Sequence, residues 1–515
     1  MAKRLFGIMS PVLGLKKDFP TILLQNAFTP DNENVLLKYG EIHRAKMRLK
    51  ELTDTNLAKV QTPDGFPILH YHWFVKHATG TGYLLAFTKA HIYHWNNATK
   101  AFDLKHTCAS DCDEWSTVSF NDQVIATNDV DKVLTWNTTG DFTVLDTASG
   151  IEYATAKYLT KAKFVTAYEN YLHLGYTTED ATVHPQRDRW CKLGDETVWD
   201  SGDAGSAEIG KGDFLTGYGH YQGLLIIFKE ESYYKMWLVP STDIFNVAPL
   251  STRIGCKASQ SIVNDKDGRL YFFASDYTFR EIGAGEISTS IDPIVKVIKP
   301  SLASLIKSIF IDEYGEVWWA IPYGNDATAN NKVLTLKDGR WGQEDLAISA
   351  FGKYERQAGY TWDTLPFSTW DTWGWDRWNT KEADTGFKID LGADFSGYSY
   401  ALHGDEKDNG EDYSGYFVLS TDLAEKQALP IYKRLLDMQL YFRKESAGAI
   451  DIYVKRDEEG EWQSAGSVSL TGSNDILVKE IHLDLRAKTF LIKCSGANKF
   501  QFLGAIFRYI PIGER

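Results

Sequence analysis

The sequence predicts an all-β protein: a β-propeller of six or seven blades, with an extended N-terminal arm and a C-terminal β-sandwich-like domain. Composition is the first observation, because 14% of the 515 residues are aromatic and 41 are glycine. Such a chain is typical of many short strands joined by tight turns. The second observation is a repeat of strand pairs roughly every 40–50 residues. A chain of this length also exceeds one ordinary core, so more than one domain is expected.

Each repeat pairs a strongly apolar segment with a more alternating one across a short polar turn. The pairs are 83–88 with 92–95, 123–127 with 133–136, 224–228 with 233–237, 269–274 with 278–282, and 317–321 with 332–336. An apolar strand followed by an alternating strand suits a blade that is covered on both faces by its neighbours. Closure of the blades into a ring removes exposed sheet edges, which favours a propeller. Stacked β-sandwiches are the alternative.

The pattern divides the chain into four parts. Residues 1–60 carry few strand signals and are predicted to be an N-terminal arm, and 61–380 to be the propeller, including a Trp-Asp-rich segment at 361–378. Residues 381–415 are rich in Gly, Asp and Tyr and are predicted to be a linker or loop. From 416 to 515, six further strand-like segments at regular spacing predict the sandwich. Residues 294–309 interrupt the repeat and are expected to form a helix or a loop between two blades.

Charge and cysteine usage narrow the class of protein. The net charge of −14 disfavours tight non-specific binding of nucleic acid, although it is compatible with a channel through which DNA slides. The five cysteines are odd in number and scattered, which indicates synthesis in a reducing compartment rather than a disulfide framework. No apolar run is long enough for a membrane span, so no membrane partner is expected.

Motifs for catalysis are weak throughout the sequence. A Gly-x-Ser-x-Gly elbow is absent, and the glycines at 217–219 do not form a phosphate loop. Asp111, Asp113 and Glu114 have the chemistry of a glycosidase acid and base, but Asp-Gly turns between strands explain such acids more simply. The sequence therefore predicts no enzyme, no catalytic residue and no cofactor.

Histidines crowd into the first repeat, at positions 70, 72, 77, 91, 94 and 106. A metal site needs three or four converging ligands, and neither a nearby carboxylate nor a second cysteine pair completes one beside Cys108 and Cys112. We therefore expect histidines on hairpin surfaces and no metal site.

Five tryptophans fall in one short window with a near-tandem Thr-Trp-Asp pattern: Trp362, Trp370, Trp373, Trp375 and Trp378. Burying an indole stabilises a protein by roughly 1.5–3 kcal/mol, so such a string must pack against its own blade or a partner. We predict that these residues form an inter-subunit or partner contact. A platform on which sugar rings stack is the alternative.

Several segments together resemble one family, the β-propeller tail proteins of short-tailed bacteriophages, described as packaged-DNA stabilisation or tail hub and nozzle proteins. The similar segments cover residues 14–380 in the family's order. They include Gly14-Leu15, Asp18-Phe19-Pro20, the blade at 115–128 that ends in Ala126-Thr127-Asn128, and Arg189-Trp190-Cys191-Lys192-Leu193-Gly194-Asp195. Ala45 follows Arg44 where the family usually has glycine, and Cys191 replaces its usual serine.

The resemblance implies a structural virion protein, made in the host cytoplasm and located in the phage tail. It would form a homo-oligomeric ring, a hexamer by the resemblance, below the portal and adaptor. The ring would contact other tail proteins and line or close the DNA exit channel, retaining packaged double-stranded DNA until ejection without sequence-specific binding. The alternative function is a glycan-binding propeller for receptor recognition. A third reading is a glycoside hydrolase or lyase.

Overall fold

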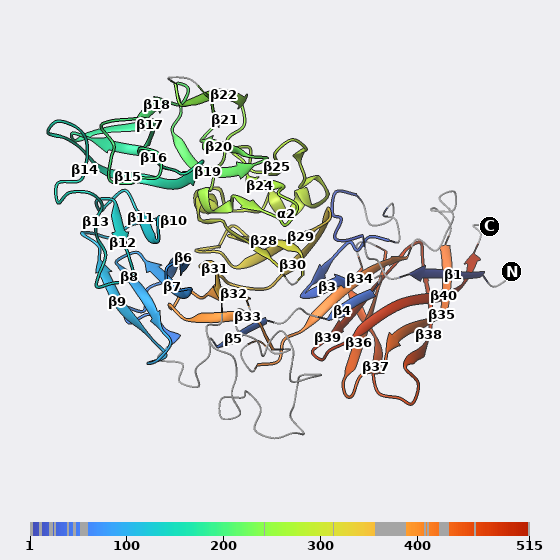
Figure 1. Ribbon diagram of the computed structural model, residues 1–515. Coiled ribbons are helices and arrows are strands. Elements are labelled where there is room, and N and C mark those ends of the chain that lie inside the picture. Colours follow the sequence, from blue (N-terminus) through green and yellow to red (C-terminus); the bar gives the residue numbers. More distant parts are fainter. Residues whose placement is uncertain are drawn as a thin grey trace.

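The computed structural model describes residues 4–9, 13–19, 24, 27–38, 41–44, 48–51, 60–240, 243–312, 314–355, 388–405, 408, 411–421, 432–457 and 460–512. They form a propeller and a sandwich that lie side by side (Figure 1). The predicted fold class, an all-β chain with a β-propeller and a C-terminal β-sandwich, is confirmed. No helix in the described part of the chain is long and apolar enough to cross a membrane.

Seven antiparallel sheets in the described residues make up the propeller. Blade one contains β6 (Ile68–Lys76), β7 (Thr81–Thr88), β8 (His91–Asn96) and β9 (Ala101–Thr107). Blade two contains β10 (Ser116–Phe120), β11 (Gln123–Thr127), β12 (Leu134–Trp136) and β13 (Thr143–Val144). Blade three contains β14 (Ile151–Ala154), β15 (Lys157–Tyr168), β16 (Tyr171–Glu179), β17 (Thr182–Trp190) and β18 (Gly205–Glu208). Blade four contains β19 (Leu215–Tyr221), β20 (Leu224–Lys229), β21 (Tyr233–Leu238) and β22 (Phe245–Ser251). Blade five contains β23 (Val263–Asn264), β24 (Leu270–Phe273), β25 (Phe279–Glu281) and β26 (Gly285–Glu286). Blade six contains β27 (Lys307–Ile311), β28 (Glu316–Ile321), β29 (Lys332–Lys337) and β30 (Arg340–Glu344).

The seventh blade closes the ring with strands from distant parts of the sequence. It contains β31 (Ala350–Glu355), β32 (Lys388–Ala393), β33 (Ser399–Asp405) and the N-terminal strand β5 (Arg48–Glu51). β5 pairs antiparallel with β33, and β31 lies beside β6 of the first blade. Because its outermost strand precedes the first blade in sequence, the ring is fastened by hydrogen bonds between the two ends of the propeller.

Large apolar side chains fill the spaces between neighbouring blades. Trp319 on β28 is fully buried and lies 4.9 Å from the ring of Phe279 on β25 and 5.7 Å from that of Trp341 on β30. These rings belong to the core shared by blades five and six. The middle strands are apolar on both faces since each blade is covered on both sides, as the repeat of strand pairs predicts.

Short helices lie only between blades in the described residues. Three form the connection from blade five to blade six: η3 (Thr289–Ile291), α2 (Asp292–Val295) and η4 (Pro300–Leu305). The predicted interruption at 294–309 corresponds to this connection. A shorter turn, η2 (Ser259–Ser261), leads from blade four into blade five.

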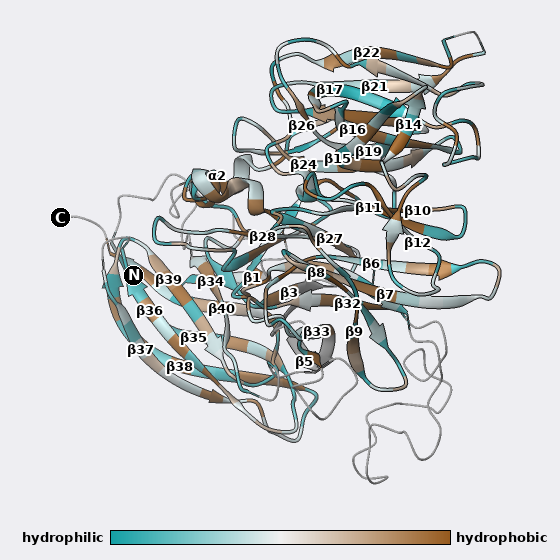
Figure 2. Cartoon of the chain, turned by 90° about the vertical axis from the view of Figure 1, so that its left-hand side faces the viewer, coloured by the Kyte–Doolittle hydropathy of each residue, from teal (hydrophilic) through white to brown (hydrophobic). Residues whose placement is uncertain are grey.

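The sandwich packs two antiparallel sheets around one apolar core. One sheet contains β1 (Arg4–Met9), β3 (Val35–Lys38), β4 (Glu41–Arg44), β35 (Tyr432–Arg443), β38 (Ile476–Ala487) and β40 (Gln501–Ile512); the other contains β2 (Asn32–Glu33), β34 (Gly415–Thr421), β36 (Ala449–Arg456), β37 (Trp462–Ser469) and β39 (Phe490–Gly496). Hydrophilic and hydrophobic residues alternate along the second half of β38, as expected for a sheet with one solvated face (Figure 2).

Two predicted boundaries need correction. Residues 1–60 do not form a separate arm: β1 and β4 pair with β40, β2 pairs with β34, and β5 pairs with β33. The segment therefore supplies strands to both domains. Residues 388–405 lie in the stretch predicted to be a linker, yet they form β32 and β33 of the seventh blade. Glycine and polar residues obscured these strands, although most of β32 is buried.

The N-terminal segment also joins the two domains. The backbone N–H of Asn34 donates to the carbonyl of Gln343 on β30 at 3.0 Å, and Gln343 Nε2 donates to the carbonyl of Asn32 at 2.7 Å. On the sandwich side, Thr29 Oγ1 donates to the carbonyl of Val418 at 2.8 Å. Lys332 on β29 forms an ion pair with Glu33 at 2.7 Å. The segment is thus hydrogen-bonded to blade six and to the sandwich at once.

Candidate functional site

A pocket of about 540 Å³ opens at the rim of the propeller, between blades six and seven. We call it the rim pocket. Its wall is the loop from β28 to β29, residues 322–331, together with Ala347 and Phe395 from blade seven and its approach. The lining residues are Tyr323, Gly324, Asn325, Asp326, Ala327, Thr328, Ala329, Asn330, Asn331, Ala347 and Phe395.

Hydrogen bonds fix the shape of this loop. The side chain of Asn331 accepts from the backbone N–H of Tyr323 at 2.7 Å and donates to its carbonyl at 2.9 Å, which closes the base of the loop. Lys299 Nζ donates to the carbonyl of Ala327 at 2.8 Å. Gly324 adopts a φ of 96°, which favours glycine. The loop is therefore held in one conformation before any ligand arrives.

The pocket lining combines aromatic rings with amides and hydroxyls. Tyr323 and Phe395 are half-buried, and Asn325 and Thr328 are exposed. Asn330 is buried; its Nδ2 donates to the carbonyl of Leu305 at 2.7 Å, while its Oδ1 has no hydrogen-bond partner. An unsatisfied buried acceptor is unfavourable, and this oxygen is enclosed by protein atoms rather than exposed to the pocket.

A second group of polar side chains lies near the propeller axis. We call it the axial group: His70 on β6, Glu114 before β10, Lys163 on β15 and Lys307 on β27. These residues come from blades one, two, three and six, yet the charge of Lys307 affects the pKa of both His70 and Glu114. Side chains from such separate blades approach one another only near the axis.

Burial dominates the titration of the axial group. It raises the pKa of Glu114, against the effect of the positive charges of Lys307 and Lys163. It lowers the pKa of Lys307 to about 8, with the Glu114 carboxylate opposing that shift, and the pKa of His70 to about 3. Burial also raises the pKa of Asp129, a second carboxyl beside Lys163. Perturbed groups of this kind mark candidate functional sites.

Protein atoms cross the axis at the axial group. Gln260 of η2 donates from Nε2 to the carbonyl of Trp115 at 3.1 Å, and its own carbonyl accepts from Ser308 Oγ at 2.8 Å. These bonds join the connection between blades four and five to blades two and six. The rim pocket is therefore the more open of the two sites.

The residues singled out from sequence have varied outcomes. Trp362, Trp370, Trp373, Trp375 and Trp378 lie outside the described residues, and their contact role stays a prediction. Of the three acids considered for catalysis, Asp111 pairs with Lys89 at 2.6 Å and Asp113 is exposed, whereas Glu114 lies in the axial group.

The sequence led us to expect the clustered histidines on hairpin surfaces, but not all of them lie there. His70 Nε2 and His72 Nδ1 contact the hydroxyl of Thr117 at 2.7 and 2.8 Å, so both link the innermost strands of blades one and two. His91 pairs with Asp64 at 2.9 Å. Residues of the rim pocket were missed because a polar loop carries no periodic signal, and Phe395 lies far from it in sequence.

Comparison with known proteins gives no relative in sequence: no family model and no curated protein matches. Among solved structures, the chain is similar to an exo-β-1,3-galactanase from Phanerochaete chrysosporium with bound β-1,3-galactotriose, at 11% identity and a TM-score of 0.27, over 89% of this chain and 99% of that one. It is also similar to a protein described as a glycoside hydrolase, at 10% identity and a TM-score of 0.26, over 87% of this chain and all of that one (100%).

Two predictions are corrected here. The solved structures named above are glycoside hydrolases and not phage tail proteins, in contrast to the predicted tail hub and to the prediction that the chain is not an enzyme. The structure adds a physical reason. In the tail-ring hypothesis we also expected the N-terminal arm to contact neighbouring subunits, but its described strands β1 and β5 pair within their own chain. The predicted homo-oligomer, portal and DNA partners, and the virion location, stay predictions.

Proposed function

We propose that the chain binds a carbohydrate in the rim pocket. The observation that carries this proposal is the lining itself: Tyr323 and Phe395 provide aromatic surface, and amide and hydroxyl side chains lie between them in the loop. A sugar presents apolar C–H groups next to hydroxyls that both donate and accept, so it suits a lining of aromatic rings and amides.

Charge favours a neutral ligand over an anion. Asp326 is the one charged residue of the pocket lining, and it is negative. Two lysines adjoin the lining, and both are already engaged. Lys299 donates to the carbonyl of Ala327, and Lys332, whose ammonium lies 5.1 Å from the ring centre of Tyr323, pairs with Glu33. With a net charge of −14 on the whole chain, phosphate-rich or polyanionic ligands would be repelled. A neutral glycan meets no such penalty.

The test is a screen of the purified chain against a glycan library, followed by calorimetric titration of the ligands found. Tyr323→Ala and Phe395→Ala should each weaken binding about tenfold, since a lost aromatic contact corresponds to about 1.4 kcal/mol. Trp462→Ala is the matched control, because Trp462 is an exposed aromatic (39%) on the distant strand β37. The proposal fails if no glycan binds, or if the pocket variants bind like the control.

Hydrolysis of a glycan that binds at the axial group, separately from the rim pocket, is a second candidate function. Glu114 and Asp129 both have a raised pKa, as a carboxylic acid that must donate a proton requires. Glu114→Gln should abolish release of reducing sugar while binding at the rim pocket stays unchanged. Asp111→Asn, which alters an exposed acid paired with Lys89, is the control. Release that persists in Glu114→Gln would remove Glu114 from the chemistry.

A further inference from the structure

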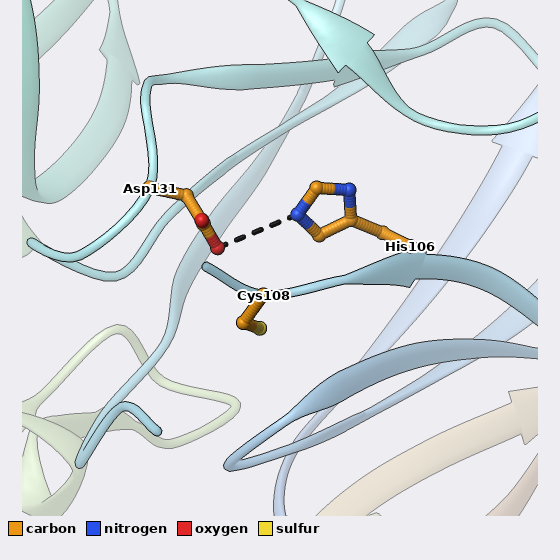
Figure 3. A group of neighbouring side chains, drawn as sticks. All are labelled: His106, Cys108 and Asp131. Carbon is orange, nitrogen blue, oxygen red and sulfur yellow. Dashed lines mark hydrogen bonds and ion pairs between the residues drawn. The ribbon is translucent and has the colours of Figure 1, made fainter. Parts of the chain in front are cut away.

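Three side chains of metal-ligand type meet where blades one and two adjoin. His106 is the penultimate residue of β9, Cys108 follows in the loop to blade two, and Asp131 lies in the loop from β11 to β12. Their ligand atoms all lie within 4.8 Å of one another (Figure 3). Figure 3 shows the imidazole and the carboxylate pointing toward each other, with the thiol beside them. His106 lies on a strand and the other two residues lie in loops, and only the propeller fold brings Asp131 to the first two.

The distance between His106 and Asp131 suits two ligands of one ion. Nε2 of His106 lies 3.4 Å from Oδ2 of Asp131. This is long for a hydrogen bond to a carboxylate. In tetrahedral zinc sites, with Zn–N and Zn–O bonds of about 2.0–2.1 Å, the nitrogen and oxygen ligands lie about 3.3 Å apart. The pair is therefore already at the separation that a bound zinc ion imposes.

Hydrogen bonds orient the carboxylate of Asp131. Asn128 Nδ2 donates to Oδ2 at 3.0 Å, and the backbone N–H of Ala109 donates to Oδ1 at 2.9 Å. The side-chain carbonyl of Asn128 in turn accepts from the backbone N–H groups of Val130 and Asp131, which fixes the turn. Partners of this kind hold metal ligands in position in known sites.

Cys112 supplies a fourth candidate ligand. The backbone N–H of Cys108 donates to the carbonyl of Ala90 at 2.8 Å and that of Cys112 to the carbonyl of Lys89 at 2.9 Å, so both ends of the segment lie against one strand connection. The Cys112 thiol donates to the carbonyl of Thr88 at 3.9 Å. Both cysteines are free thiols. A Cys-x-x-x-Cys segment with a histidine and an aspartate would complete a tetrahedral set of two sulfurs, one nitrogen and one oxygen.

A second group of metal-ligand side chains lies on the sandwich, and there a cationic side chain of the protein already occupies the site. Asp437, Glu480 and His482 on the sandwich also bring their ligand atoms together. There Arg508 forms ion pairs with both Asp437 and Glu480. Among the described residues, no lysine or arginine pairs with Asp131. The negative charges of Asp131 and a Cys108 thiolate would match those of a divalent cation.

We propose that His106, Cys108 and Asp131, with Cys112 beside them, bind a zinc ion that fastens blade one to blade two. Sulfur, imidazole and carboxylate ligands together favour zinc over magnesium or calcium. The predicted absence of a metal missed this site because Asp131 is remote from the cysteines in sequence and reaches them only through the fold. The proposal is independent of glycan binding.

The test uses the full chain, reduced and stripped of metal, and titrated with Zn²⁺ or with Co²⁺ as a spectroscopic probe. We expect one zinc per chain by elemental analysis, a higher melting temperature with zinc, and the charge-transfer absorption of a cobalt–thiolate bond. Cys108→Ser should abolish that absorption. His106→Gln and Asp131→Asn should each weaken zinc binding by about tenfold or more.

His482→Gln is the control, since it changes an exposed histidine in the cluster that Arg508 occupies and should leave zinc binding unchanged. Asp131→Asn preserves side-chain shape, so it tests the site even if a cysteine variant unfolds. The proposal is overturned if reduced wild-type chain binds no zinc or gives no cobalt–thiolate absorption. It is also overturned if Cys108→Ser and Asp131→Asn bind zinc as tightly as wild type.

Discussion

Arg189 forms a bidentate ion pair with Glu179 inside blade three. Its Nε donates to Oε1 and its Nη2 to Oε2, each at 2.9 Å. The side chains are 9% and 2% exposed. Arg187 Nη1 and Thr177 Oγ1 donate to the same carboxylate at 2.7 and 2.9 Å. Both oxygen atoms of the Glu179 carboxylate thus accept hydrogen bonds, and the carboxylate keeps its negative charge in a buried site.

Replacement of this acid should destabilise the protein strongly. Glu179→Gln leaves the Arg189 guanidinium buried without its counter-ion, and such changes reduce the free energy of unfolding by about 3–5 kcal/mol. Denaturant unfolding followed by circular dichroism measures the loss. Glu208→Gln is the control, because Glu208 pairs with Arg187 but is 50% exposed and should contribute about 0–1 kcal/mol. Equal losses in both variants would contradict the assignment.

The same pair predicts a dependence on acid. Burial alone would raise the pKa of Glu179, but the hydrogen bonds and charge of Arg189 outweigh it, so the folded pKa lies below the usual value. The stabilisation is therefore complete above the unfolded pKa of about 4.3 and is lost as pH falls through the folded pKa. Wild type should lose more stability than Glu179→Gln on acidification. Parallel pH–stability curves would refute this.

Gln343 should control the attachment of the N-terminal segment to blade six. Gln343→Ala removes the donor to the carbonyl of Asn32, and an unsatisfied buried carbonyl costs about 1–3 kcal/mol. We expect faster cleavage within residues 24–51 by a protease at low concentration, read by mass spectrometry. Gln463→Ala, an exposed glutamine on β37, should leave the cleavage rate unchanged. An unchanged rate in Gln343→Ala would contradict the attachment.

Sequence periodicity predicted the blades whose middle strands are continuous and apolar. The five segment pairs correspond to β7 with β8, β11 with β12, β20 with β21, β24 with β25, and β28 with β29. Blade three was missed because its strands carry the buried ionic pair of Glu179 and Arg189, which breaks an apolar pattern. Blade seven was missed because β5 and β31 are separated by most of the chain.

The candidate sites were less predictable than the fold. Glu114 was noted as a candidate acid, but its neighbour Lys307 lies four blades further along the chain, and no spacing rule connects them. Phe395 and Tyr323 both line the rim pocket although they are far apart in sequence, and no spacing rule connects them either. Local periodicity reports which face of a strand is buried, whereas a site depends on which loops the ring closure brings together.

Trp319 should be among the most sensitive core positions of the propeller. It is fully buried between blades five and six, and its Nε1 donates to the carbonyl of Ser261 at 3.1 Å. Trp319→Ala should lower the free energy of unfolding by about 3–5 kcal/mol, as large core truncations do. Trp319→Phe keeps a ring and loses the hydrogen bond, so it should cost less. A loss below about 1 kcal/mol in Trp319→Ala would contradict the packing.

Lys307 should produce a rise of stability in alkaline solution. Burial lowers its pKa to about 8 in the folded chain, whereas an unfolded lysine titrates near 10.4. Between these values the unfolded state binds more protons, so the free energy of unfolding increases with pH, by up to about 3 kcal/mol. Lys307→Met should remove that increase. The free energy of unfolding of wild type should therefore rise toward that of Lys307→Met between pH 8 and pH 10.5, so that the difference between the two proteins shrinks. Lys296→Met is the control, since its ammonium is 73% exposed and should leave the curve unchanged. If wild type and Lys307→Met keep a constant difference over this range, Lys307 titrates normally and the axial group is hydrated rather than buried.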